Sequence, residues 1–441
     1  MGVKVVKFGG SSLASAEQFV KVGNIIKADS DRRYVVPSAP GKRFSDDIKV
    51  TDMLYRCYEL AKSGNDISEV FSKIEERYNG IISELGITLD LTTEFERIKN
   101  GIMNHAGRDF TASRGEYLNG LILAKYLGYD FIDAQDVIFF EENGKFDSVL
   151  TNNVLSERLS KVSHAVIPGF YGAMPNGTIK TFSRGGSDVT GSIVALAANA
   201  DLYENWTDVS GFLVADPRIV KDPKGIKCIT YAELRELSYM GASVLHEDAI
   251  FPVRKAKIPI NIKNTNAPED MGTMIVSEAE DDANEYIITG ISGKKGFSVI
   301  NIEKDTMNSE IGFLRRVLTV LENNKISFEH IPSGIDTMSI VVHTSEIEGK
   351  QESVCEQIRD ITEADTVTID DGIALIAVVG RGMRSKHGTA ARVFAALSHA
   401  RINIKMIDQG SSELNIIVGV NTEDFEAATK AIYDVFVMSV D

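Results

Sequence analysis

The chain has 441 residues, of which 43% are apolar, and a formal net charge of −16. This length exceeds one ordinary core, so we expect two or three globular domains. The acidic balance and the lack of any Lys/Arg run exclude nucleic acid and anionic membranes as expected partners, and no apolar run is long enough to span a bilayer. The three cysteines are scattered, and the histidines do not have the spacing of metal ligands, so we expect no structural metal site. The N-terminus has no signal-peptide pattern, which predicts a cytoplasmic protein.

Residues 1–276 alternate short β-branched runs with helical patterns. Strands are expected near 34–36, 131–133, 164–167 and 258–262. The alternation is typical of an α/β domain with a largely parallel sheet flanked by helices. A polar stretch at 277–285 contains five acidic residues and predicts a linker to a second region.

The first motif of chemical interest is Lys-Phe-Gly-Gly-Ser-Ser at residues 7–12. It follows an apolar run and precedes an amphipathic segment, so we expect a strand, a turn and a helix. Gly9 and Gly10 let the backbone approach an anion closely, and a helix N-terminus favours negative charge. Lys7 adds a mobile positive charge, so the motif predicts a phosphate-binding turn.

A second glycine-rich motif is Arg-Gly-Gly-Ser-Asp at residues 184–188. It lies between an expected strand at 178–182 and an apolar helix at 189–200. Arg184 offers a planar fork for a carboxylate or phosphate, and Asp188 could orient a lysine or lie near a metal. A capped turn with an exposed ion pair explains the pentapeptide equally well.

Three further motifs lie at expected loops. Residues 206–212 (Trp-Thr-Asp-Val-Ser-Gly-Phe) lead into Asp-Pro-Arg at 216–218, where Thr207 and Asp208 could meet a ribose or base and Arg218 a phosphate. An Asx turn before Pro217 is the alternative for part of this stretch. Ser-Arg-Gly-Glu at 113–116 and Lys-Val-Thr-Asp at 49–52 each precede a helical pattern and read as helix caps on their own.

The C-terminal region contains a repeat with a constant offset of 76 residues, which relates Gly312 to Gly388 and Leu321 to Leu397. Each copy reads as strand, glycine-started helix, strand, strand and helix, close to a ferredoxin-like βαββαβ unit. We expect one unit at 286–365 and another at 366–441. Paired units create interfaces for small molecules, so ligand sensing is favoured over plain structural duplication.

Taken in order, these motifs and the tandem repeat resemble the aspartate kinase family across nearly the whole chain. The resemblance implies an amino acid kinase fold followed by two ACT units, in series or with the first nested within the second. It also implies ATP-dependent phosphorylation of the L-aspartate β-carboxylate to 4-phospho-L-aspartate, with Mg²⁺. This reaction begins the pathway to lysine, threonine and methionine.

The family's catalytic roles carry over to the two glycine-rich motifs. Lys7 would neutralise charge on the transferring phosphoryl group, and Asp188 would orient the ammonium of Lys7. The turn formed by Gly9, Gly10 and Ser11 would contact the nucleotide, with backbone N–H groups from the two glycines.

The aspartate-binding roles fall on four other residues. The resemblance implies that Arg184 binds the α-carboxylate and Glu116 the α-ammonium, while Thr51 and Ser187 supply hydroxyl contacts. A carboxylate nucleophile needs no general base, which fits the absence of a catalytic histidine.

The remaining nucleotide-contacting positions include departures from the family pattern. Matching positions are Thr207, Asp208, Leu213, Arg218, Ser243 and Val244. Many relatives have a lysine at the position of Ser243, and some have a tyrosine at that of Leu213. Residues 37–43 also differ from the family's Ser-Ala loop, and Lys42 or Arg43 could replace the missing charge.

The ACT units imply feedback inhibition, with L-lysine as the expected effector and threonine, alone or with lysine, as the alternative. The matching effector positions are Met307, Glu310, Phe313, Leu314, Ser327, Phe328, Glu329 and Ser333. Phe313, Leu314 and Phe328 read equally well as core residues. We expect a homodimer through the ACT units, with a tetramer as the alternative. A non-catalytic amino-acid sensor and a kinase for another acidic amino acid are the competing functions.

Overall fold

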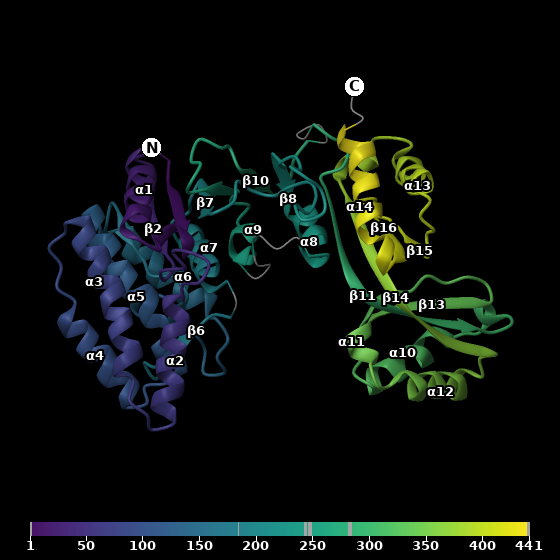
Figure 1. Ribbon diagram of the computed structural model, residues 1–441, viewed down its shortest axis with the longest axis horizontal. Coiled ribbons are helices and arrows are strands. Elements are labelled where there is room, and N and C mark those ends of the chain that lie inside the picture. Colours follow the sequence, from purple (N-terminus) through teal and green to yellow (C-terminus); the bar gives the residue numbers. More distant parts are fainter. Residues whose placement is uncertain (1, 184, 242–244, 246–248, 281–284, 439–441) are drawn as a thin grey trace. The chain divides into compact units, whose positions relative to one another are not determined.

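The computed structural model describes residues 2–183, 185–241, 245, 249–280 and 285–438. Its contacts divide the chain into two compact units (Figure 1). The N-terminal unit comprises Met1–Phe212, Lys227–Tyr231 and Ser243–Ala279, and the C-terminal unit comprises Leu213–Ile226, Ala232–Ala242 and Glu280–Asp441. The segments 213–226 and 232–241, which the sequence analysis includes in 1–276, have most of their contacts within the C-terminal unit.

An eight-stranded sheet forms the centre of the described N-terminal unit, in the order β3-β4-β2-β1-β7-β9-β10-β8. Only the β9/β10 pair is antiparallel, so the expected largely parallel sheet is confirmed. The strands are β1 (Lys4–Phe8), β2 (Arg32–Pro37), β3 (Asp130–Phe131), β4 (Ala165–Val166), β7 (Leu202–Thr207), β8 (Cys228–Thr230), β9 (Ile260–Asn264) and β10 (Thr273–Val276). A separate hairpin pairs β5 (Tyr171–Ala173) with β6 (Ile179–Thr181).

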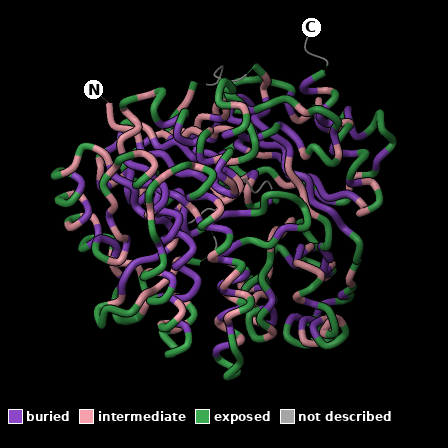
Figure 2. Tube along the Cα trace, turned by 60° about the vertical axis from the view of Figure 1, so that its left-hand side comes forward, coloured by how far each residue is buried: buried purple, intermediate pink, exposed green. Residues whose placement is uncertain are grey.

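Helices connect these strands, as the alternating pattern predicts. They are α1 (Ala16–Lys27), α2 (Val50–Lys62), α3 (Ser68–Leu85), α4 (Thr92–Met103), α5 (Arg108–Leu127), α6 (Ser148–Leu159), α7 (Gly186–Ala197), α8 (Tyr231–Tyr239) and α9 (Phe251–Lys255). Figure 2 shows buried residues running along the strands and along the inner faces of helices, with exposed residues in the loops. Helix α5 is buried almost all round from Thr111 to Ala124, which hides its amphipathic period.

The expected strand, turn and helix around the first glycine-rich motif are confirmed, although the helix begins later than the glycine turn, and one expected helix cap is wrong. The segment after Gly10 first forms a 3₁₀ turn at Ser11–Leu13, and α1 begins only at Ala16, where the Ser15 hydroxyl accepts the Gln18 N–H. The Ser-Arg-Gly-Glu motif at 113–116 does not cap a helix but lies in the middle of α5. The 3₁₀ turn therefore separates the glycine turn from the N-terminus of α1.

The C-terminal unit is built on one antiparallel six-stranded sheet in the order β12-β13-β11-β14-β16-β15. Its strands are β11 (Gly290–Glu303), β12 (Phe328–His330), β13 (Thr337–His343), β14 (Thr366–Val379), β15 (Met406–Asp408) and β16 (Asn415–Asn421). Its helices, besides the segment that α8 contributes, are α10 (Phe313–Asn323), α11 (Thr344–Ile347), α12 (Gln351–Thr362), α13 (Thr389–His399) and α14 (Phe425–Tyr433). The expected strand and helix order of both repeats is confirmed.

The two repeats share the long strands β11 and β14. The later half of β11 pairs with β13 and with the start of β14, while its earlier half pairs with the end of β14, which also pairs with β16. The first ferredoxin-like unit is thus nested within the second. Gly312 and Gly388 precede α10 and α13 with φ of +82° and +83°, a conformation that favours glycine.

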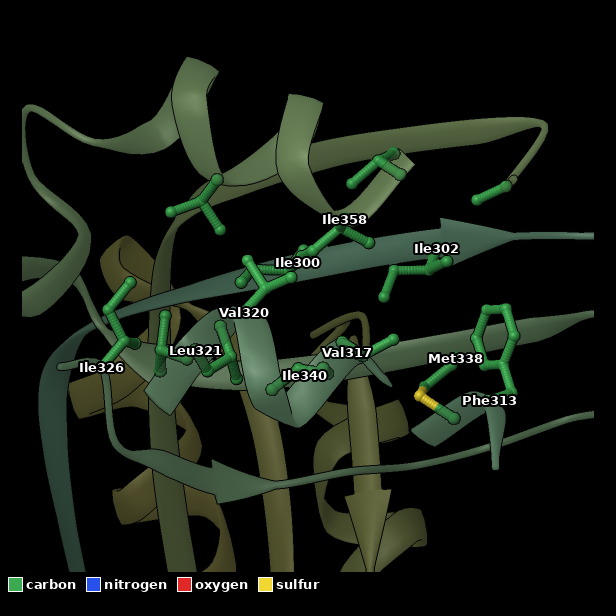
Figure 3. Packing of buried hydrophobic residues seen from close by; sticks show 14 of the residues in the cluster. Ile300, Ile302, Phe313, Val317, Val320, Leu321, Ile326, Met338, Ile340 and Ile358 are labelled. Atoms are coloured by element: carbon green, nitrogen blue, oxygen red, sulfur yellow. The ribbon is translucent and has the colours of Figure 1, made fainter. Parts of the chain in front are cut away.

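The core of the first repeat lies between its strands and helices α10 and α12 (Figure 3). Helix α10 contributes a stripe of buried side chains at helical spacing, namely Phe313, Val317, Val320 and Leu321. Strands β11 and β13 contribute alternate residues, which is typical of a half-buried sheet. Among the helices of the described ranges, none is long and apolar enough to cross a bilayer.

Candidate active site

Lys7 lies near the end of the central strand β1 and is only 7% exposed. Its Nζ is 2.5 Å from Oδ1 of Asp188 and donates to Oδ1 of Asn205 at 3.4 Å. Asn205 also donates to Asp188 Oδ1 at 2.9 Å. The carboxylate and the amide therefore fix the ammonium at the carboxyl end of the sheet, where ligands bind in α/β folds.

The glycine turn follows directly after β1. The Gly9 N–H donates to the carbonyl oxygen of Trp206 at 2.9 Å, so in this conformation it is not available to a phosphate, contrary to expectation. A Cβ on Gly10 would lie 2.8 Å from the carbonyl oxygen of Ala39, which explains the need for glycine there. The turn is a point of close backbone approach between strand β1 and a neighbouring loop.

Helix α7 carries the second glycine-rich motif at its N-terminus. Gly185 precedes the helix with a φ of +71°, and Ser187 and Asp188 occupy its first turn. A Cβ on Gly169 would lie 2.7 Å from the Ser187 side chain, so the chain before β5 packs directly against the motif. Arg184 itself lies outside the described residues.

Glu116 is the most perturbed carboxyl group of the site. It lies in the middle of α5, is 6% exposed, and its Oε2 atom has no hydrogen-bond partner among the described residues. Burial raises the pKa of Glu116 to about 8, against the smaller opposing effect of a hydrogen bond from the Ala39 backbone. Such a group can pair with a cation that enters with a ligand.

A cavity of about 890 Å³ joins these elements. Its lining includes five of the predicted residues: Lys7, Thr51, Glu116, Ser187 and Asp188. Sequence reasoning missed the other titratable residues of the lining, namely Tyr55, Arg108, Asp109 and Lys180. Arg108 lies over the Tyr55 ring at 4.3 Å, and Asp109 accepts from the Thr181 hydroxyl at 3.0 Å. Their sequence signal is weak, because isolated charged residues at helix starts and strand ends are usual on protein surfaces.

The predicted nucleotide-contacting residues are distributed over both units. Thr207 ends β7 beside β1, and its hydroxyl donates to Asp208 at 3.2 Å. Leu213 and Arg218 belong to the C-terminal unit, where Arg218 is held by both oxygens of Asp216. Ser243 and Val244 lie outside the described residues.

The two cations considered as replacements for the missing lysine have other partners. Lys42 donates to the Ser45 carbonyl oxygen at 3.0 Å, and Arg43 pairs with Asp47 at 2.9 Å. Neither residue lines the cavity that contains Lys7. The described structure therefore gives no support to a compensating role for either side chain.

Among the predicted effector residues, several are structural in the described C-terminal unit. Met307 and Phe313 belong to the buried core of the first repeat, as the alternative reading of Phe313 expects. Glu310 pairs with Lys304 at 2.9 Å and with Arg316. Ser333 donates to the Ile331 carbonyl oxygen at 3.3 Å. Each of these four side chains is therefore packed in the core or bonded to a neighbour within the same unit.

Four predicted effector residues lie at the edge of the same repeat. Leu314 and Phe328 are 37% and 44% exposed, and the Ser327 backbone N–H donates to Glu346 at 2.6 Å. Glu329 accepts a hydrogen bond from the Tyr239 hydroxyl at the end of α8 and lies 3.3 Å from Nε2 of His343. The carboxylate of Glu329 thus has the chemistry to bind an ammonium group.

The described residues contain no group of three or more His, Cys, Asp or Glu side chains arranged to hold a metal ion. Asp188, the acidic residue of the second glycine-rich motif, is engaged by Lys7 and Asn205. Mg²⁺ usually keeps waters and binds through substrate phosphates with one or two carboxylates. The single carboxylate of Asp188 therefore fits a Mg²⁺ ion that is held mainly by the phosphates of a bound nucleotide.

Comparison with known proteins decides the family. Residues 2–264 match the model of the amino acid kinase family, and residues 376–436 match an ACT domain model. The chain is 41% identical over 455 residues to Aspartokinase 3 of Bacillus subtilis, covering 99% of both proteins. The chain belongs to the aspartokinase family. As an aspartokinase it combines the catalytic fold of the N-terminal unit with ACT units after it.

Solved aspartokinase structures share the fold along the whole chain. The aspartate kinase of Clostridium acetobutylicum is 53% identical, has a TM-score of 0.90 and is covered completely. E. coli aspartokinase III in complex with aspartate and ADP is 24% identical with a TM-score of 0.72, covering 98% of this chain and 99% of the other. At 24% identity, the comparison with the E. coli enzyme supports only a shared fold.

Proposed function

We propose that this aspartokinase transfers the γ-phosphoryl group of MgATP to the β-carboxylate of L-aspartate, which yields ADP and 4-phospho-L-aspartate. The observation that carries the proposal is the single cavity that contains both the Lys7–Asp188 pair and the buried carboxyl of Glu116. The first feature suits a transferring phosphoryl group, and the second suits the α-ammonium of an amino acid. The reaction would begin synthesis of lysine, threonine and methionine.

The residues of the cavity would act mainly by position and charge. Phosphoryl transfer depends on alignment and electrostatic stabilisation, and the attacking β-carboxylate is already ionised. Lys7 would neutralise charge that develops on the transferring group, while Asp188 and Asn205 prevent its ammonium from moving. Mg²⁺ bound to the nucleotide supplies further neutralisation of phosphate charge.

The remaining predicted residues would orient L-aspartate. Glu116 would receive the α-ammonium, and the hydroxyls of Thr51 and Ser187 line the same cavity. Arg184 would bind the α-carboxylate through its guanidinium fork. This orientation leaves the β-carboxylate directed at the phosphoryl group.

Formation of an acyl phosphate tests the proposed reaction. The protein is incubated with MgATP and L-aspartate, and hydroxylamine traps the product as a hydroxamate. We expect hydroxamate with L-aspartate and at most a trace with L-glutamate. A folded sample that binds ATP but forms no hydroxamate with either would contradict catalysis, and preference for glutamate would contradict the substrate.

We further propose that L-lysine inhibits the enzyme by placing its ammonium at Glu329 in the ACT region. The position of Glu329 between Tyr239 and His343 supports this proposal, since the carboxylate is held at the edge of the first repeat. A homodimer through the ACT units is the expected assembly.

The effector proposal predicts that Glu329→Gln weakens inhibition by lysine roughly 10-fold or more, the usual effect of removing one charge-assisted hydrogen bond. The kcat without lysine should change less than about twofold. The measurement is the lysine concentration for half-inhibition, with Glu426→Gln as a control because Glu426 is paired with Lys295 at 2.5 Å and is not a predicted effector residue. An unchanged lysine response in Glu329→Gln, or a response to threonine alone, would exclude this assignment.

A further inference from the structure

A buried ion pair lies outside the cavity, between α3 and the loop of residues 38–49 (the 38–49 loop). Arg77 of α3 is 7% exposed and Asp47 of the loop is 9% exposed. The Arg77 Nη2 atom donates to both carboxylate oxygens of Asp47, at 2.8 and 2.7 Å. Arg43 adds hydrogen bonds from its Nε and backbone N–H, both at 2.9 Å. Hydrogen bonding from Arg43 and the nearby charge of Arg77 hold the pKa of Asp47 well below its usual range, so the carboxylate stays charged.

The second guanidinium nitrogen of Arg77 ties the loop to the glycine turn. Nη1 donates to the carbonyl oxygen of Gly41 at 3.2 Å and to that of Ala14 at 3.4 Å. The Gly41 N–H in turn donates to the Gly10 carbonyl oxygen at 2.8 Å. A Cβ on Gly41 would lie only 2.7 Å from the Gly10 carbonyl carbon, so the two backbones are in direct contact.

The same loop reaches the aspartate-binding side of the cavity. The Ala39 backbone forms a hydrogen bond with the Glu116 carboxyl, and the Ser38 carbonyl oxygen accepts from Asn119 at 2.6 Å. Its Pro40 carbonyl oxygen accepts the Val50 N–H at 3.2 Å, one residue before Thr51. A displacement of the 38–49 loop would therefore also shift the glycine turn, Glu116 and the start of α2, because the loop backbone is bonded to all three.

We propose that Arg77 and Asp47 are positioning residues of the kinase reaction, which hold the 38–49 loop so that the glycine turn, Glu116 and Thr51 keep their relative places. The proposal rests on the kinase function proposed above. Neither side chain lines the cavity that contains Lys7, so each acts through the loop backbone. An ion pair that had only to stabilise the fold could be replaced by apolar side chains at little cost, whereas here both side chains also bond to the backbone of the loop.

The geometry explains why such an anchor matters. Residues 42–46 of the loop are exposed, and exposed loops with few apolar contacts open readily. A misplacement of reacting groups by about 1 Å can cost roughly 100-fold in rate. Arg77 and Asp47 fix the loop from its buried side and leave its outer residues in solvent.

The test compares Arg77→Lys with a matched variant, Arg32→Lys. Arg32 is also paired with a buried carboxylate, Glu204, at 2.8 Å, and also donates to a backbone carbonyl, that of Ile25. It lies at the beginning of β2, opposite Lys4, whereas the glycine turn follows the other end of β1. Both substitutions keep a positive charge but lose the fork.

We expect both variants to lose similar thermal stability, while only Arg77→Lys changes catalysis. Its kcat/KM for L-aspartate and for MgATP should fall about 10- to 100-fold, whereas Arg32→Lys should stay within about twofold. Asp47→Asn, which keeps the shape of the side chain, should reproduce the change if Arg77→Lys does not fold. Wild-type kcat and KM values in a folded Arg77→Lys or Asp47→Asn variant would overturn the proposal, as would equal losses in Arg32→Lys.

A second readout separates this proposal from the proposed reaction. Affinity for MgATP, measured by calorimetry, should be weaker in Arg77→Lys than in Arg32→Lys, whether or not aspartate is the phosphoryl acceptor. If the wild-type protein forms no hydroxamate but this difference in affinity is found, the reaction assignment fails and the positioning role of Arg77 stands. Equal MgATP affinity in both variants overturns the positioning role.

Discussion

The variant Lys7→Ala should lower kcat by about 10²- to 10³-fold, the usual effect of losing one preorganised donor to a developing charge. This corresponds to about 2.7–4 kcal/mol of transition-state stabilisation. The KM for MgATP should rise less, because the ammonium is most important when charge shifts to the transferring group. The measurement is hydroxamate formation under saturating MgATP and L-aspartate, with folding checked by thermal unfolding.

Lys4→Ala provides the matched control. Lys4 begins the same strand, and its Nζ pairs with Asp29 at 2.6 Å at the end of β1 that lies away from the glycine turn. A partly exposed pair of this kind contributes little to stability, about 0–1 kcal/mol, and should not change kcat. Near-normal turnover in Lys7→Ala, or equal losses in both variants, would remove Lys7 from the catalytic role.

The variant Glu116→Gln should raise the KM for L-aspartate about 10- to 100-fold near pH 8, because a charge-assisted hydrogen bond to the α-ammonium is lost. Glutamine keeps the size of the side chain and should leave the fold and the KM for MgATP nearly unchanged. Glu94→Gln is the control, since Glu94 accepts from the Tyr117 hydroxyl, next in sequence to Glu116, and does not line the cavity. An unchanged aspartate KM in Glu116→Gln would exclude Glu116 as the ammonium partner.

The raised pKa of Glu116 also predicts how aspartate binding depends on pH. Burial raises this pKa to about 8, so the empty site is mostly protonated at neutral pH. An ammonium favours the carboxylate, and binding therefore releases a proton. The KM for L-aspartate should fall as the pH rises from about 6 to about 8, by at most about tenfold per unit for one proton. In Glu116→Gln the same plot should be flat, and a retained slope would assign the proton to another group.

Much of the fold follows from patterns in the sequence. The offset of 76 residues predicted the repeated unit, because Gly312 and Gly388 recur where each helix starts with a positive φ. It could not predict that β11 and β14 run through both repeats, since pairing between distant strands depends on the packing of the whole sheet. The true start of α1 did have a local signal, the capping pattern of Ser15 and Gln18.

The sequence predicted site residues that belong to distinctive motifs. It did not predict residues that only the folding of the chain brings together. Lys7 and Asp188 belong to glycine-rich motifs, and the structure places them 2.5 Å apart. The Ser-Arg-Gly-Glu motif was misread because α5 is buried on nearly all sides, so no polar face marks its extent. The Arg77–Asp47 pair joins residues 30 positions apart, and nothing in their local sequence distinguishes them from surface charges.

If Glu329 receives the ammonium of the effector as proposed, the hydrogen bond from Tyr239 to Glu329 would compete with that ammonium. Any ammonium that reaches Glu329 meets a carboxylate already bonded to Tyr239 and close to His343, so the loss of those contacts is subtracted from its affinity. Tyr239 is the last residue of α8, and the chain continues within a few residues to Ser243, a predicted nucleotide position. Linkage between two binding sites is reciprocal. A ligand that holds α8 in place and an effector that displaces Tyr239 would therefore lower each other's binding affinity by the same factor.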